Sequence, residues 1–238
     1  MRYAIIAAGE GSRLAQEGIV APKPLVKIQD ETLIDRLIRI FMANGGEEID
    51  VICNGLTQLV AHHLERIQQQ GLGGKAVSLK WIQKTTPSSM HSFYELSRFL
   101  KDEPFCLTTV DTIFDETDFA AYISAFKASD KDGMMAVTDY IDDEKPLYVG
   151  TDQNMHITGF FDTPNDCHYI SGGIYCLKPK AIQTLEDCME AGLSRMRNFQ
   201  RQLVKDGLEL QAYRFGKILD VDHADDIQKA EKFLTGKI

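Results

Sequence analysis

The sequence predicts an α/β protein with a Rossmann-like, mostly parallel central sheet, helices on both faces and a smaller second half. Two patterns predict it. Short apolar segments alternate with amphipathic ones over residues 1–140, as strands and helices do in a parallel sheet. The first apolar segment, residues 3–8, ends in a glycine-rich turn, as a buried first strand does. In such sheets, ligands bind at the carboxyl ends of the strands.

The elements of the first half follow from the spacing of their apolar residues. Residues 32–42 place Leu33, Leu37 and Ile40 at helical spacing, and Asn44 with two glycines ends the helix. By the same criteria we expect strands at residues 49–53, 76–82, 105–110 and 134–140, and helices at residues 56–70, 89–100 and 119–128. The alternation indicates successive βαβ units.

The second half of the chain is less regular. We expect strands at residues 147–150, 156–161, 168–177, 209–214 and 217–221, and helices at residues 181–190, 198–205 and 224–234. No Pro/Ser/Gly-rich linker, low-complexity tract or repeat divides the 238 residues. We therefore expect a single domain over residues 1–238, with halves at residues 1–140 and 141–238.

Composition narrows the classes of partner. A net charge of −9 and a pI near 5.2 argue against nucleic acid, and the cations form no basic run. The N-terminal apolar run is too short for a secretory signal, and no stretch reaches membrane-spanning length, so we expect a cytoplasmic protein that does not engage a membrane. Buried, reduced thiols are expected for the five cysteines, which lack C-x-x-C spacing: Cys53, Cys106, Cys167, Cys176 and Cys188.

The most informative segment is residues 3–28, YAIIAAGEGSRLAQEGIVAPKPLVKI. Gly9 and Gly11 permit positive φ and a close backbone approach, and successive N–H groups in such a turn form an anion-binding nest. Arg13 and Lys23 add a cation at each end. This combination fits a nucleotide phosphate.

Two familiar phosphate-binding motifs are absent from this turn. The dinucleotide fingerprint needs a third glycine where Leu14 stands, and the P-loop needs a Gly-Lys-Ser or Gly-Lys-Thr that does not follow. What remains is G-x-G-x-R followed by P-K-P, in which Pro22 and Pro24 restrict the backbone on both sides of Lys23.

The pattern A-A-G-x-G-x-R-L followed by P-K-P-L resembles the nucleotidyltransferase family that makes nucleoside-diphosphate sugars and related activated alcohols. The resemblance implies that Arg13 and Lys23 are the catalytic cations that contact the triphosphate, and that Lys23 also contacts the acceptor phosphate. It assigns the nucleotide-binding turn to Ala7, Ala8, Gly9 and Gly11. The alternative is a plain βα turn with solvent-exposed charges.

Carboxylates at the ends of two predicted strands suggest a Mg²⁺ site. Asp111 directly follows the strand at residues 105–110, and one or two carboxylates with triphosphate oxygens commonly hold Mg²⁺. From spacing alone, a helix or turn cap is an equal alternative for Asp111. The resemblance places Asp220 at the usual second metal aspartate, with Asp222, two residues further on, as the second choice.

Base recognition is less well defined. The resemblance places Gln83 at the position that contacts the nucleobase edge, and Ser88 and Ser89 where a small pair is expected. A Pro-Ser N-cap for the helix at Ser89 is equally compatible. The preferred base therefore stays open.

The acceptor side matches the family in part. The segment S-G-G-I-Y-C-L resembles an acceptor-side strand, in which Gly172 and Gly173 permit close approach to a ligand. Asp162 and Thr163 stand where sugar-activating members often have Glu-Lys, so a cation is missing there. The identity of the phosphorylated acceptor stays open.

The reaction that the resemblance implies is Mg²⁺-dependent nucleotidyl transfer from a nucleoside triphosphate to a sugar phosphate or a related phosphorylated alcohol, with release of pyrophosphate. The missing cation at Thr163 motivates an alternative, a non-catalytic nucleotide-binding or regulatory protein of the same fold. An NAD-dependent oxidoreductase is disfavoured by Leu14, Arg13 and Lys23. The sequence is compatible with an oligomer and does not predict one.

Overall fold

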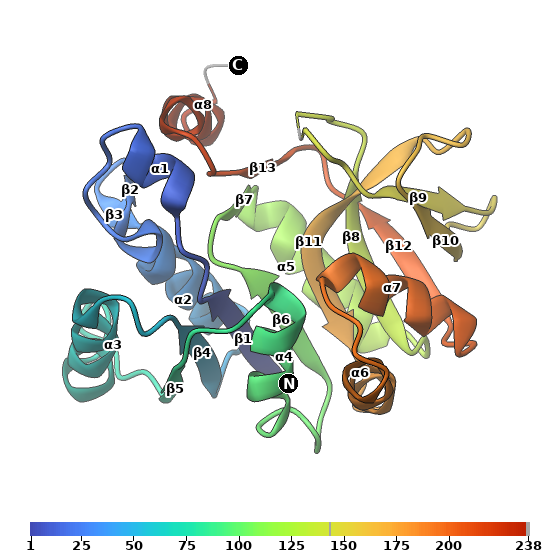
Figure 1. Ribbon diagram of the computed structural model, residues 1–238, viewed down its shortest axis with the longest axis horizontal. Coiled ribbons are helices and arrows are strands. Elements are labelled where there is room, and N and C mark those ends of the chain that lie inside the picture. Colours follow the sequence, from blue (N-terminus) through green and yellow to red (C-terminus); the bar gives the residue numbers. More distant parts are fainter. Residues whose placement is uncertain (143, 237–238) are drawn as a thin grey trace.

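A large mixed sheet forms the centre of the computed structural model, which describes residues 1–142 and 144–236. Its strands are β1 (Arg2–Ala7), β4 (Ile49–Cys53), β5 (Leu79–Gln83), β6 (Phe105–Thr109), β8 (Gly133–Thr138), β9 (Tyr148–Thr151), β10 (Ile157–Phe161), β11 (Tyr169–Leu177) and β12 (Leu210–Arg214). The order is β10-β9-β11-β6-β1-β4-β5, with β8 between β11 and β12 (Figure 1).

The two halves of the chain contribute differently to this sheet. Strands β5, β4, β1 and β6 are parallel neighbours, which confirms the predicted Rossmann-like unit. Beyond β6 the antiparallel strand β11 pairs with β6, β8 and β9. The sequence predicted a strand at each of these nine positions, but apolar spacing carries no information on strand direction. The predicted fold class is confirmed.

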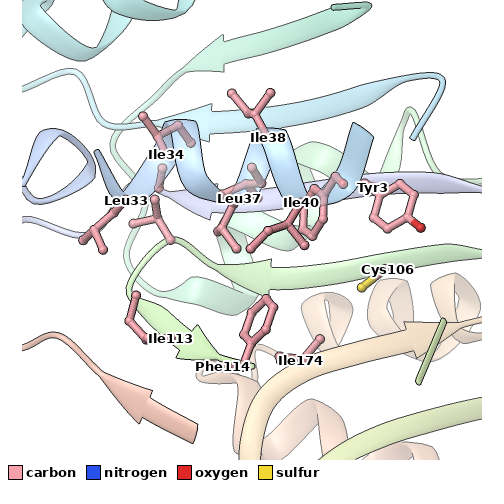
Figure 2. Packing of buried hydrophobic residues seen from close by; sticks show 14 of the residues in the cluster. Tyr3, Leu33, Ile34, Leu37, Ile38, Ile40, Cys106, Ile113, Phe114 and Ile174 are labelled. Atoms are coloured by element: carbon pink, nitrogen blue, oxygen red, sulfur yellow. The ribbon is translucent and has the colours of Figure 1, made fainter. Parts of the chain in front are cut away.

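Helices cover both faces of the sheet, as predicted. One face carries α2 (Leu33–Ala43), α3 (Gln58–Gln70) and α5 (Glu116–Ala128), and the other carries α4 (Ser89–Ser97), α6 (Ala181–Glu190) and α7 (Met196–Lys205). Helix α8 (Ala224–Leu234) adds Ala230 to the core of the first face. Strand β1 shows why two cores form: Tyr3 and Ile5 are buried on the first face, Ala4 and Ile6 on the second. Figure 2 shows the first core, where α2 lies over β1.

Several short elements near the carboxyl edge of the sheet were not predicted. They are α1 (Ser12–Gln16), the 3₁₀ helix η1 (Lys23–Leu25), β2 (Lys27–Ile28), β3 (Glu31–Thr32) and β7 (Thr112–Phe114). Strand β13 (Ile218–Asp220) lies within the predicted strand at residues 217–221. Two to five residues are too few to show a period in the sequence. Strands β7 and β13 pair antiparallel, with Thr112 opposite Asp220. This pairing brings β13 to the strand that directly follows Asp111.

The helix predicted at residues 119–128 begins three residues earlier, so its predicted start is wrong. Asp115 is the N-cap of α5, and its carboxylate accepts from the N–H groups of Thr117, at 2.8 Å, and Asp118, at 3.1 Å. Capping of this kind satisfies N–H groups that have no partner within the helix. The capping residue of α5 is therefore Asp115 and not Asp111.

All five cysteines are free thiols, and four of them are buried. Among the described residues, no helix combines the length and the apolar character that a bilayer span requires.

Candidate active site

The glycine-rich turn follows β1 at the carboxyl edge of the sheet. Gly11 has a φ of +63° and is the N-cap of α1. A Cβ on Gly11 would lie only 3.0 Å from the Cβ of Lys23. Gly11 is therefore needed for its left-handed backbone and for the space that Lys23 occupies, while a Cβ on Gly9 would meet no atom within 4 Å.

Lys23 lies at the centre of the site. It is the first residue of η1, with Pro22 as the N-cap, and its side chain is 9% exposed. Its Nζ forms ion pairs with Asp111 and with Asp222, the latter at 2.6 Å. Burial alone would lower the pKa of Lys23, but the two carboxylates outweigh it and the pKa is raised. The ammonium group is therefore charged throughout the physiological pH range.

Arg13 joins the same cluster from α1. Its Nη1 donates to Oδ2 of Asp222 at 2.8 Å, while Oδ1 of Asp222 accepts from Lys23. Burial opposes ionisation of Asp222, but the charges of Lys23 and Arg13 prevail and lower its pKa. The two predicted cations and two of the three predicted metal carboxylates thus form one connected cluster.

One oxygen of this cluster has no hydrogen-bond partner among the described residues. Asp111 follows β6 and gives one carboxylate oxygen to Lys23, but its Oδ1 is buried and makes no hydrogen bond to any described residue. A buried carboxylate oxygen is costly to leave unpaired. Since Asp115 caps α5, capping does not explain Asp111, and this oxygen is available to a bound cation.

The third predicted metal residue, Asp220, lies on the neighbouring side of this cluster. Asp220 lines a second cavity only, whereas Asp222 lines both that cavity and the one beside the glycine-rich turn. Within the described ranges, no three side chains from His, Cys, Asp and Glu are grouped as a metal cage. The arrangement fits a hard cation held by two carboxylates, with further ligands supplied by a substrate.

The first cavity has a volume of about 400 Å³ and opens beside the glycine-rich turn. Its lining includes the predicted residues Ala8, Gly9, Gly11, Arg13, Lys23, Ser88, Ser89, Asp111 and Asp222. Ala7 is buried in the first core and does not line it. Gln83 does not line it either, and its amide donates to the carbonyl of Thr57 at 3.2 Å.

Four residues with hydroxyl groups in this lining were not predicted: Ser12, Thr86, Ser92 and Thr109. Thr86 and Ser92 lie 2.6 Å apart through their hydroxyl oxygens, one before α4 and one inside its second turn. The signal for Ser92 was its position three residues after Ser89, on the same side of the helix. These groups give the cavity wall hydrogen-bonding capacity.

Ser88 has a role that the N-cap alternative does not describe. It occupies the N-cap position of α4, but its side chain makes no capping hydrogen bond. Its hydroxyl instead contacts Nδ1 of His91 at 2.9 Å and accepts from the backbone N–H of Arg195 at 3.2 Å. Arg195 has a φ of +71°, so a strained residue at the start of α7 supports this wall of the cavity.

The second cavity has a volume of about 500 Å³ and shares Arg13 and Asp222 with the first. Its other lining residues come mainly from the second half of the chain, and include Tyr140, Lys145, Ser171, Gly172, Ile218, Asp220 and Lys229. The shared pair marks the boundary where a ligand of one cavity would meet a ligand of the other.

The two glycines of β11 differ in what they do. A Cβ on Gly172 would lie 2.2 Å from Cδ1 of Ile218, so this glycine is needed for β13 to pack against β11. Gly173 has a φ of +73° and lies where the pairing of β11 with β8 shifts register. Gly172 lines the second cavity, but Gly173 does not.

Asp162 lies outside both cavities. Its carboxylate is 59% exposed and pairs with Arg197 at 2.6 Å and with Arg201 at 2.7 Å, both on α7. Hydrogen bonds from Arg201 and Arg197 lower the pKa of Asp162. Two arginines therefore lie near the segment in which Thr163 replaces the expected lysine. Both arginines are more than thirty residues away from Thr163 in the sequence.

Known proteins are similar to this chain in sequence and in fold. The chain is 25% identical over 191 residues to mannose-1-phosphate guanylyltransferase catalytic subunit beta from Dictyostelium discoideum, which covers 78% of this chain and 52% of that relative. The chain therefore spans about half the length of this curated relative.

Solved structures share the fold. The inositol-1-phosphate CTP transferase from T. maritima superposes with a TM-score of 0.78 at 20% identity, over 98% of this chain and 96% of that chain. The UDP-glucose pyrophosphorylase from Acinetobacter baumanii gives a TM-score of 0.79 at 18% identity, over 98% and 92%.

The sequence model of one family, described as nucleotidyl transferase, matches residues 3–237, which is nearly the whole chain. The glycine-rich turn, Lys23 and both carboxylates that contact it lie within the matched residues. The chain belongs to the nucleotidyl transferase family.

Proposed function

We propose that this protein transfers a nucleotidyl group from a nucleoside triphosphate to a sugar phosphate or a related phosphorylated alcohol, with release of pyrophosphate. One observation carries the proposal. The Lys23 ammonium lies between the carboxylates of Asp111 and Asp222 in a cavity beside a phosphate-binding turn, and Asp222 also lines a second polar cavity, so that the two cavities meet at a junction. A reaction between two phosphorylated substrates needs such a junction.

The first cavity is proposed to hold the nucleotide. The backbone of Ala8, Gly9 and Gly11 would contact the triphosphate, with Arg13 and Lys23 as its counter-ions. Ser88 and Ser89 would lie beside the base. Ala7 and Gln83 do not line this cavity. They are the last residues of β1 and β5, and would act indirectly, through the position of these strands.

The carboxylates fit a divalent cation, which we propose is Mg²⁺. Asp111 offers a buried oxygen without a partner, and Asp222 faces the same space. We therefore favour Asp222 over Asp220 as the second ligand, with Asp220 directed toward the second cavity. When bound, the ion would supply positive charge to the phosphate oxygens and help to orient them.

The second cavity is proposed to hold the phosphorylated acceptor, beside Gly172. Gly173 would shape the strand, and Asp162 would hold Arg197 and Arg201 at its edge. An acceptor phosphate oxygen would attack the α-phosphorus, forming one P–O bond as the bond to the bridging oxygen breaks and pyrophosphate leaves. Because the acceptor phosphate is already an anion, no general base is required, and catalysis depends on positioning and charge neutralisation.

This division suggests how the chain is organised. We propose that residues 1–140 form the nucleotide-binding half of one nucleotidyltransferase domain, and that residues 141–238 bind the acceptor and complete the metal site. The Arg13–Asp222 contact, at 2.8 Å, supports this because it joins the two halves at the site.

Pyrophosphate release tests the proposal. Each of four nucleoside triphosphates would be combined with mannose 1-phosphate, glucose 1-phosphate, inositol 1-phosphate, glycerol 3-phosphate or phosphocholine. At least one pair is expected to turn over, and Lys23→Ala is expected to reduce kcat/KM by at least about 100-fold, which corresponds to the loss of about 2.7 kcal/mol of transition-state stabilisation.

Lys27→Ala is the matched control, because Lys27 lies four residues further on and is exposed. Turnover that survives in Lys23→Ala would contradict the proposed role. Nucleotide binding without pyrophosphate release for any acceptor would favour the non-catalytic alternative.

A further inference from the structure

A buried glutamine lies beneath the second cavity. Gln200 is on α7, among the helices that cover the second face of the sheet (Figure 1), and is 1% exposed. Its Nε2 donates to Oγ of Ser171 at 3.3 Å, while its Oε1 makes no hydrogen bond to any described residue. A buried amide whose oxygen has no hydrogen bond destabilises the folded state.

The neighbours of Gln200 on α7 show which kind of side chain packs well at this position. The other buried side chains of this helix, Met196, Phe199 and Leu203, are apolar and belong to the second core. An apolar residue of similar size at position 200 would avoid the unpaired oxygen. The amide is therefore better explained by the group that it contacts, which is Ser171.

Ser171 connects the amide to the second cavity. It lies on β11 next to Gly172, lines the cavity, and is fixed through its backbone N–H, which donates to the carbonyl of Leu147 at 2.8 Å. The pairing of β11 with β8 shifts register directly after Ser171. Because the Ser171 oxygen accepts from Gln200, its own O–H remains available to donate to a ligand.

Tyr175 completes this buried group. It is 6% exposed, and burial raises the pKa of its phenol, while the nearby hydrogen-bonding groups of Gln200 and Ser171 partly offset this effect. The phenol stays neutral at physiological pH. The two side chains next to the Ser171 hydroxyl, Gln200 and Tyr175, are thus neutral, and the carboxylate of Asp220 lines the same cavity.

We propose that Gln200 is a positioning residue that orients the Ser171 hydroxyl to donate a hydrogen bond to a hydroxyl oxygen of the acceptor. This inference rests on the proposed function, which assigns the second cavity to the acceptor. Arg13 lies at the junction of the cavities, where the acceptor phosphate belongs, and Lys23 is paired there with Asp222, whereas Ser171 lines only the second cavity. The ligand class is therefore a phosphorylated sugar or polyol, and not a phosphorylated quaternary amine.

Steady-state kinetics of the full chain with the acceptors above test this inference. Ser171→Ala and Gln200→Leu are each expected to raise the KM of the best sugar or polyol phosphate at least tenfold, with the nucleotide KM within twofold of wild type. Gln200→Leu is expected to keep or raise the urea midpoint, because the unpaired amide is removed. A purely structural role would lower the midpoint and leave the acceptor KM unchanged.

The double variant separates positioning from a direct effect. Gln200→Leu is expected to add less than twofold to the acceptor KM in a Ser171→Ala background. An additive effect there, an unchanged acceptor KM in Gln200→Leu, or phosphocholine as the best wild-type acceptor would overturn the inference. Wild-type protein without turnover for any pair would overturn the proposed function, and this inference with it.

Discussion

At the scale of single residues, the cation that would bind the triphosphate occupies the carboxylates that would bind the metal. The ammonium of Lys23 contacts Asp111 and Asp222, and Arg13 contacts the second of them. Opposite charges held this closely in a partly buried site attract each other strongly. A metal ion without nucleotide would therefore have to displace Lys23, whereas a metal–triphosphate complex supplies a new partner to each group.

Metal binding in the absence of nucleotide tests this competition. Lys23→Met removes the ammonium and keeps most of the side-chain volume, so the variant is expected to bind Mn²⁺ roughly tenfold more tightly, a difference of about 1.4 kcal/mol. Electron paramagnetic resonance of free Mn²⁺ gives the dissociation constant, and Lys27→Met is the control. Equal Mn²⁺ affinity in the variant and the wild type would show that Lys23 does not compete.

The residues of the site differed in how far the sequence could predict them. Gly11, Arg13 and Lys23 form a compact motif, and the structure brings them together as that motif requires. Asp222 was ranked second because the family resemblance placed Asp220 at the usual metal position. Gln200 was not predicted, because one glutamine on an amphipathic helix gives no signal until its burial is known.

At the scale of elements, the site depends on how β13 packs on the sheet. The sequence predicted a strand near residues 217–221, but not its partner β7, because Thr112–Phe114 is too short to show a period and lies among turn-forming residues. The observed pairing explains why a glycine is needed at position 172, where Ile218 crosses β11.

A double-mutant cycle tests this contact. Gly172→Ala places a methyl group 2.2 Å from Cδ1 of Ile218, and is expected to cost about 1–3 kcal/mol of unfolding free energy. Ile218→Val removes that Cδ1 atom, so the double variant is expected to recover most of the loss. Urea denaturation measures all four proteins, and strictly additive costs would contradict the packing explanation.

A second element-scale feature is the tyrosine between β8 and β11. The Tyr122 hydroxyl donates to the carbonyl of Met134 at 2.6 Å and accepts from the backbone N–H of Cys176 at 2.9 Å. Tyr122→Phe would leave both groups buried and unpaired, and is expected to cost about 1–3 kcal/mol. Tyr94→Phe, at a residue that is 40% exposed, is the control for urea denaturation. Equal urea midpoints for the two variants would refute this role.

At the scale of the whole molecule, a buried carboxylate at the amino-terminal edge of the sheet links stability to pH. Asp50 is fully buried, and Nε and Nη2 of Arg2 each donate to it at 3.0 Å. Burial raises the pKa of Asp50 from 3.8 to about 6, although Arg2 acts in the opposite direction. Between these values the folded state binds more protons than the unfolded chain, so this group's contribution to stability falls as pH rises.

The prediction is a comparison of wild type with Asp50→Asn. The Asp50 contribution is complete below about pH 4 and is lost above about pH 6, a change of about 3 kcal/mol for a shift of about two pH units. The difference in unfolding free energy, wild type minus variant, is expected to shrink by that amount between pH 4 and pH 7. Chemical denaturation at both pH values measures it, and a constant difference would refute the assignment.

The order of the chain has a consequence for synthesis. The turn that carries Arg13 and Lys23 is made about two hundred residues before Asp222, which contacts both. The β7–β13 pairing can form only after residue 220 has been made. A nascent chain thus exposes its phosphate-binding cations long before it can close the cluster, and can do so only once Asp222 has been made.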